Sequence, residues 1–218
     1  FRTSHEIAKI EVWDYDELKE MLDADALRAF RDRANLPSHP VLRGSAQNPD
    51  IFFQNREAVN RDFDALPGVV EAYMNEVNRR TGSNYHLFDY YGDPDAEQVL
   101  IAMGSVCNTA QEVVDYLRSK GEKAGCINVH LYRPFSAKHL LAALPKTVKQ
   151  IAVLDRTKEA GALGDPLYLD VVAALKGSEY EAVPVYGGRY GLGSKDTTPR
   201  AVLSPFRNLA AAPALPGF

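Results

Sequence analysis

The stretch Val99–Ser105 constrains the fold more than any other part of this sequence. It opens with five apolar residues that do not alternate with polar ones, a pattern typical of a strand buried on both faces of a parallel sheet. The glycine and serine at its end predict a tight turn. Thr109 and Glu112 have capping-box spacing and predict the start of a helix, which Gly121 is placed to end. Strand, turn and helix form the first half of a βαβ unit.

This alternation of strand and helix continues through the second half of the chain. Further strands are predicted over residues 86–91, 125–131, 150–154 and 182–186. Helices are predicted after Ser136, from Pro166 with Asp165 as its cap, and over residues 199–209. Pro184 fits an edge strand best, and Pro205 is predicted to kink or shorten the last helix. The pattern predicts an α/β fold in which a five-stranded, mostly parallel sheet is flanked by helices.

The first part of the chain is predicted to be a partly helical connector. Asp14 is a candidate cap for one short helix, and a second is expected over residues 25–30. Residues 41–63 show no sustained period, so an irregular segment that contacts another surface is expected there. Pro67 is predicted to begin a helix that Gly82 ends.

Composition excludes several classes of function. The formal net charge of −4 argues against general attraction to nucleic acid or anionic lipid, and no apolar run approaches the roughly 20 residues that span a bilayer. Two cysteines, Cys107 and Cys126, are too few for a disulfide framework, which favours buried, reduced thiols in a cytoplasmic protein. The absence of an initial methionine and the linker-like end (residues 210–218) suggest a piece of a longer protein.

The loops after the parallel strands are the candidate site, because binding loops gather at the carboxyl ends of such strands. We call this edge the rim. Its candidate contact or anion-binding residues are Arg133, Arg156, Lys158, Gly188, Arg189, Gly193, Ser194 and Lys195. The arginines and lysines could hold a phosphate or carboxylate, or could pair with acids at an interface. Arg189 and Lys195 are expected either to pair with acids, for which Asp155, Glu159 and Asp196 are the local candidates, or to project toward a neighbouring domain outside this chain.

The glycine-rich stretch 187–196 resembles a phosphate loop only in part. Gly188 and Gly193 have the right spacing, but Ser194-Lys195 reverses the order that a P-loop requires. We therefore expect the glycines to shape the loop through positive φ angles. The five histidines show no metal-binding spacing, and neither cysteine is near a histidine, so the residues predict no catalytic or metal site.

Several longer phrases resemble the pyruvate:ferredoxin (flavodoxin) oxidoreductases. They occupy residues 1–6, 39–44, 47–50, 131–135, 154–159 and 187–196. The resemblance implies a parent enzyme with thiamine diphosphate, Mg²⁺ and [4Fe–4S] clusters, which oxidatively decarboxylates pyruvate, makes acetyl-CoA and passes electrons to ferredoxin or flavodoxin. It also implies that the cofactor-binding residues lie outside this chain.

The same resemblance implies a domain organisation. Residues 1–84 would end a thiamine-pyrimidine-type domain and its connector, residues 85–212 would form a domain similar to the carboxyl-terminal domain of transketolases, and residues 213–218 would be a linker. The sheet of that second domain has one antiparallel strand, which would fall at Leu87–Tyr91. The two domains would contact the second subunit of a homodimer.

Two functions follow as hypotheses. In the first, the chain is a non-catalytic part of the oxidoreductase and makes contacts between domains and subunits. In the second, Arg133, Arg156, Arg189 and Lys195 form an anion-binding module that contributes to coenzyme A or phosphate binding. A binding module predicts that these cations converge on an open hollow, whereas a docking surface predicts that they are dispersed or already paired.

Overall fold

The structure is a computed structural model that describes residues 7, 10, 12–42 and 44–211. The family-like phrase at residues 1–6 and the predicted linker at 213–218 lie outside the described residues. Contacts divide the chain into two compact units with a boundary between Ala65 and Leu66. The predicted domain boundary at residue 84 stays a prediction.

The first unit is helical. α1 (Tyr15–Met21) begins at Asp14, whose carboxylate accepts hydrogen bonds from the backbone of Asp16 and Glu17 in a capping box. α2 (Ala24–Asp32) and α3 (Pro49–Ala58) follow. None of these three helices contains a buried residue. Among the described residues, their apolar side chains are therefore not part of a buried core.

The prediction of an irregular segment over residues 41–63 is wrong from Pro49 onward, where the structure has helices. Pro49 stands at the first position of α3 after Asn48, and α4 (Asn60–Thr81) begins two residues after α3 ends. Proline suits a helix start because its missing N–H has no partner there in any case. Because no side chain of α3 is buried, the sequence carries no apolar period that would have indicated the helix.

Pro67 is not the first residue of a helix, as predicted, but lies buried inside α4. Gly82, with a φ angle of 70°, ends that helix as expected. Val70 and Met74 of α4 pack against the core of the second unit. Proline has no N–H, so Pro67 cannot donate its helix hydrogen bond, and this packing stabilises the helix in spite of that loss.

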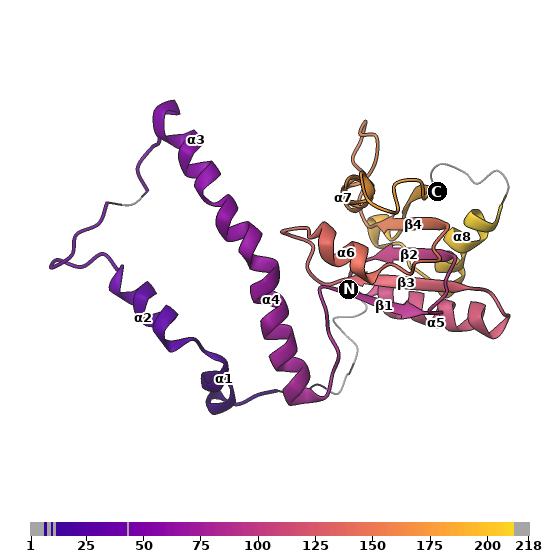
Figure 1. Cartoon of the computed structure of the whole chain (residues 1–218), viewed down its shortest axis with the longest axis horizontal. Coiled ribbons are helices and arrows are strands. Elements are labelled where there is room, and N and C mark those ends of the chain that lie inside the picture. The colour runs from indigo at the N-terminus through magenta and orange to yellow at the C-terminus, as the bar shows by residue number, and fades with distance from the viewer. Residues whose placement is uncertain (1–6, 8–9, 11, 43, 212–218) are drawn as a thin grey trace. The chain divides into compact units, whose positions relative to one another are not determined.

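The second unit contains the sheet (Figure 1). Its strands are β1 (Phe88–Gly92), β2 (Gln98–Ala102), β3 (Ala124–Val129), β4 (Gln150–Asp155) and β5 (Val185–Arg189), in the spatial order β1-β3-β2-β4-β5. β1 runs antiparallel to β3 and the remaining pairs are parallel, which confirms the five-stranded, mostly parallel sheet and its antiparallel first strand.

Helices cover both faces of the sheet. On one face Val99 and Ile101 pack with α6 (Ala137–Ala143) and α7 (Pro166–Leu175). On the other, Leu100 and Ala102 pack with α5 (Val106–Ser119) and α8 (Pro199–Ala210). The last four residues of β2, from Val99 to Ala102, are almost completely buried, as predicted for a central parallel strand.

Three details of the predicted elements are corrected. α5 begins at Val106, before the predicted capping box, because Gly104 turns the chain at a φ angle of 79° and the first helical turn packs into the core. Strand β5 begins at Val185 because residues 180–183 form a turn, although its edge position agrees with Pro184. Pro205 does not shorten α8, since Val202, Phe206 and Leu209 hold the helix against the sheet.

Both cysteines are free and buried, and burial raises the pKa of each thiol to about 12. Thiols with such a pKa are almost fully protonated at neutral pH and react slowly. Within the described part of the chain, the helices are too short or too polar to span a membrane.

In the last turns of α4, Glu76 pairs with Arg79 and Arg80, and this ion-pair cluster should make stability depend on pH. Arg79 and Arg80 donate hydrogen bonds to the Glu76 carboxylate, and these bonds lower the pKa of Glu76 from 4.5 to about 2. Stability from this cluster is therefore present above pH 4.5 and is lost as the pH falls towards 2. We expect a carboxyl NMR titration to give Glu76 a midpoint near 2, and Arg79→Gln to raise it. An unchanged midpoint in the variant contradicts this assignment.

Candidate functional site

The rim lies where the four parallel strands end. The loops after β2, β3, β4 and β5 meet at this edge because these strands run in the same direction. The amino end of β1 joins them, since Phe88 pairs with Val129. The sequence-based placement of the rim loops on one edge is thus confirmed.

Arg133, in the loop after β3, is already engaged. Its guanidinium lies 2.7 Å from the carboxylate of Asp170 on α7 and stacks on the Tyr132 ring at 3.9 Å from the centroid. It also donates to the carbonyl and hydroxyl oxygens of Tyr132. Charge and stacking together hold this arginine within its own domain.

Asp155 connects the end of β4 to the start of α7. Its side chain is buried, and its two oxygens accept hydrogen bonds from the backbone N–H groups of Leu167 and Tyr168, at 3.0 and 3.1 Å. Burial raises the pKa of this carboxyl, and the two backbone bonds oppose that rise. Asp155 therefore caps α7 from a neighbouring strand.

Asp165, the residue before α7, makes no cap bond of its own, contrary to the predicted capping role. Its carboxylate instead lies 2.6 Å from Nε of Arg189 and accepts a bond from the N–H of Glu159. The acid that pairs with Arg189 is thus none of the three local candidates. Asp165 is nearly buried whereas the Arg189 side chain is 39% exposed, so the pair lies at the surface of the rim and fastens the loop after β4 to the end of β5.

The remaining rim cations are exposed. Nε of Arg156 donates a long bond of 3.4 Å to the carbonyl of Gly191. Within the described residues, the structure gives Lys158 and Lys195 no ion pair, so the predicted pairing of Lys195 is not found. Leu163, in the same loop as Lys158, is fully exposed. The outer rim therefore exposes three cations and, in the loop after β4, an apolar side chain.

Two of the rim glycines have the positive φ angles that were predicted for the loop. Gly188 is not in a loop but in β5, where it pairs with Leu154 and is buried. Gly191 and Gly193 have φ angles of 63° and 62°, and Ser194 follows with a φ of 61°. These residues form a short 3₁₀ turn over Leu192–Ser194 rather than the start of an α-helix, so the P-loop geometry is not present.

Gly191→Ala should destabilise the chain by about 1 kcal/mol or more, because alanine adopts a positive φ at a cost. A β-carbon there would also lie 3.1 Å from Nε of Arg156. Gly193→Ala is the matched control, since it shares the φ angle but has no atom within 4 Å of the added carbon. Urea unfolding of both variants measures the difference. Equal losses would assign the whole effect to backbone strain.

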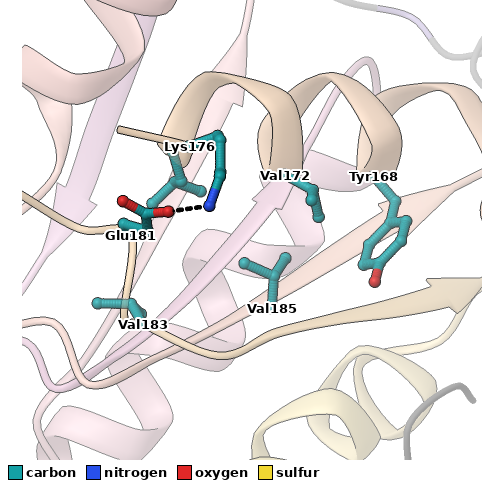
Figure 2. Close-up of a pocket in the computed structure, with 7 residues that line it drawn as sticks. Tyr168, Val172, Lys176, Glu181, Val183 and Val185 are labelled. Atoms are coloured by element: carbon teal, nitrogen blue, oxygen red, sulfur yellow. Dashed lines mark hydrogen bonds and ion pairs between the residues drawn. The ribbon is translucent and has the colours of Figure 1, made fainter. Parts of the chain in front are cut away.

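Two well-formed hollows in the described part of the chain are identified by their lining residues. The first, about 290 Å³, lies between α7 and β5 and is lined by Tyr168, Val172, Leu175, Lys176, Glu181, Val183 and Val185 (Figure 2). The second, about 480 Å³, lies in the first unit and is lined by Ser45, Gln47, Phe52, Asn55 and Arg56. Neither contains a candidate rim residue. Neither of these two hollows therefore brings the rim cations together.

Sequence reasoning missed the partners of the rim arginines. Asp170 lies inside α7 and carries no local signal, because its contact with Arg133 spans 37 positions. Asp165 did carry a signal, but as a helix cap. Across residues 12–42 and 44–211, no group of three metal-ligating side chains is present.

Comparisons with known proteins show the family. The family model "Pyruvate:ferredoxin oxidoreductase core domain II" matches residues 96–202, and "Pyruvate flavodoxin/ferredoxin oxidoreductase, thiamine diP-bdg" matches residues 1–75. The pyruvate-flavodoxin oxidoreductase of Enterobacter agglomerans is 58% identical over 218 residues, the whole of this chain. The pyruvate:ferredoxin oxidoreductase of Moorella thermoacetica is 56% identical over 211 residues. The chain belongs to the pyruvate:ferredoxin (flavodoxin) oxidoreductase family.

This member of the pyruvate:ferredoxin oxidoreductase family spans 18% of the length of each of those two relatives. Among solved structures, it is similar to 2-oxoglutarate:ferredoxin oxidoreductase from Magnetococcus marinus, with a TM-score of 0.44 and 14% identity over 79% of this chain and 27% of that one. A split gene transketolase gives a TM-score of 0.40 and 17% identity over 56% of this chain and 39% of that one.

Proposed function

We propose that this chain is one part of a longer oxidoreductase that converts pyruvate to acetyl-CoA and passes electrons to flavodoxin or ferredoxin. Within it, residues 1–84 end the thiamine-diphosphate-binding region, residues 85–212 form a docking domain similar to that of transketolases, and residues 213–218 link to the next domain. Family membership and the small share of the relatives' length support this. We also propose a cytoplasmic homodimer.

The described residues do not fit the cofactors of such an enzyme. A [4Fe–4S] cluster needs four thiolates, whereas Cys107 and Cys126 are two buried thiols with raised pKa values. Arg133 and Arg189, which could face a diphosphate, are occupied by Asp170 and Asp165. We therefore propose that residues outside the described part of this chain hold thiamine diphosphate, Mg²⁺ and the clusters.

The observation that carries the docking role is the exposure of apolar side chains in the first unit. Phe30, Ile51, Phe52, Phe53 and Phe63 are all about half exposed or more. Isolated soluble domains rarely leave such a set uncovered, and contiguous exposed apolar surface marks interaction sites. The proposal assigns their cover to the remainder of the oxidoreductase and its second subunit.

Phe53→Asp tests this role in the full-length enzyme. We expect it to lower pyruvate-dependent flavodoxin reduction at least tenfold while the isolated 218-residue chain unfolds as before, because Phe53 is 67% exposed in that chain. Gln54→Asp, at the next exposed position of α3, is the matched control. Equal activity of the two variants would contradict docking through this face.

One observation supports the anion-binding alternative. Lys158 and Lys195 have no ion pair among the described residues, so both could bind an anion. Titration of the isolated chain with phosphate or coenzyme A, followed by amide chemical shifts, separates the two roles. Docking predicts no saturable shift at residues 156–158 and 191–195. Saturable shifts confined to these residues would replace the docking role of the rim with anion binding.

A further inference from the structure

The outer edge of β5 has backbone groups that no described residue pairs. The carbonyl of Pro184 accepts a bond from Ile151, and the N–H of Tyr190 donates to Asp155, at 3.0 and 3.2 Å. Even-numbered residues of this strand therefore face β4, and the N–H and C=O groups of Val185, Gly187 and Arg189 face outward. Among the described residues these outward groups have no hydrogen-bond partner.

The 290 Å³ groove lies next to this open edge, on the side of the sheet that α7 covers. Figure 2 shows Val172 of α7 and Val185 of β5 facing one another across it. Leu169 and Val172 of α7 are both about 40% exposed, so the helix is apolar where the sheet ends. An additional strand beside β5 would direct alternate side chains into this space.

The chemistry of the groove defines what fits it. Its walls are aliphatic apart from Tyr168, Lys176 and Glu181, and the last two pair with each other (Figure 2). The groove thus offers no free charge to an incoming group. A partner with an uncharged aliphatic side chain fits, whereas a charged side chain would lose hydration without gaining a partner.

We propose that a sixth strand, supplied by the part of the oxidoreductase outside residues 1–218, pairs with the outer edge of β5 and inserts an uncharged aliphatic side chain into the groove. This rests on the proposed function. The length of chain outside the structure supports the choice of occupant, because the chain spans only 18% of its two relatives. Strand addition to an open edge uses the main chain for affinity and a pocket for specificity.

Hydrogen exchange of the Val185, Gly187 and Arg189 amides tests the proposal. In the isolated 218-residue chain we expect exchange close to the unprotected rate. In the full-length enzyme the same amides should exchange at least about tenfold more slowly, because a strand bond must open first. Fast exchange in both proteins overturns the proposal. Protection in the isolated chain that grows with its concentration also overturns it, since the occupant is then a second copy.

Val172→Glu in the full-length enzyme should return these amides to the fast rate, because the longer, hydrated carboxylate side chain takes the space that an aliphatic side chain of the added strand would fill. Ala173→Glu is the control, since the neighbouring residue of α7 is exposed and does not line the groove. An unchanged melting temperature of the isolated chain shows that both variants fold. Equal exchange in the two variants overturns the proposal. Protected amides in an enzyme that does not oxidise pyruvate would refute the proposed function and leave this inference standing.

Discussion

Replacing Gly92 with alanine is expected to destabilise the second unit by about 4 kcal/mol or more, enough to unfold a typical domain of this size in part. Gly92 ends β1 and pairs with Gly125 of β3, at a φ angle of 140° that other residues rarely adopt. A β-carbon would lie 2.5 Å from the α-carbon of Gly125 and 2.6 Å from the carbonyl of Ala124. Both are backbone atoms of β3, so rotation of a side chain cannot relieve the clash.

Gly121→Ala separates the steric effect from the conformational one. Gly121 also has a positive φ, of 80°, but no atom lies within 4 Å of an added β-carbon. We expect a loss of about 1 kcal/mol there, from backbone strain alone. Denaturant unfolding followed by circular dichroism measures both variants. Losses of similar size would show that β3 moves aside and that the β1–β3 contact is not tight.

Asp155→Ala should cost about 3 kcal/mol of unfolding free energy. The change leaves the N–H groups of Leu167 and Tyr168 without their acceptor, and each unsatisfied buried donor costs about 1–3 kcal/mol. It also removes the negative charge at the amino end of α7. Asp155→Asn keeps one acceptor oxygen and should lose clearly less. Equal losses in thermal and urea unfolding would mean that packing, not capping, determines the effect.

The pH dependence of Asp155→Asn follows from the raised pKa of Asp155. An acid with a raised folded pKa favours folding most below its unfolded pKa, near 3.8, and this contribution falls as the pH rises through the folded value. Asparagine does not titrate. The stability advantage of the natural chain over Asp155→Asn should therefore shrink from about pH 4 to pH 7. An advantage that grows over this range would contradict the burial of the carboxyl.

The central strands were predictable because burial on both faces leaves a direct mark on the sequence. The unbroken run in β2 places Val99 and Ile101 on one face and Leu100 and Ala102 on the other. The direction of β1, in contrast, could not be predicted from its own residues. It came from the family resemblance, since the residues of β1 carry no sign of whether its neighbour runs parallel or antiparallel.

Helices without buried residues left no such mark. α3 has an apolar content that follows no period, so the sequence could not distinguish it from an irregular segment. The start of β5 was misplaced for a related reason, because Val183 and Pro184 look like strand residues, but Val183 closes a turn and Pro184 follows it. In both cases the missing information is the surface that the segment contacts.

At the rim, the sequence identified the charged residues but not their partners. The pairs Arg133–Asp170 and Asp165–Arg189 join segments 37 and 24 positions apart, and only the fold brings them together. The glycines were more predictable, since the positive φ of Gly191 follows from local chain geometry. Pairing depends on topology, whereas turn conformation depends on neighbours in the chain.

The attachments of α7 have a mechanical consequence for the rim. Asp170 holds the loop after β3, the amino-terminal amides hold the end of β4, and Asp165 holds the end of β5. One helix is thus the common anchor of three loops that are distant in sequence. A displacement of α7 would therefore move all three loops together. A molecule that binds to any one of the loops can shift that loop only by also shifting the helix.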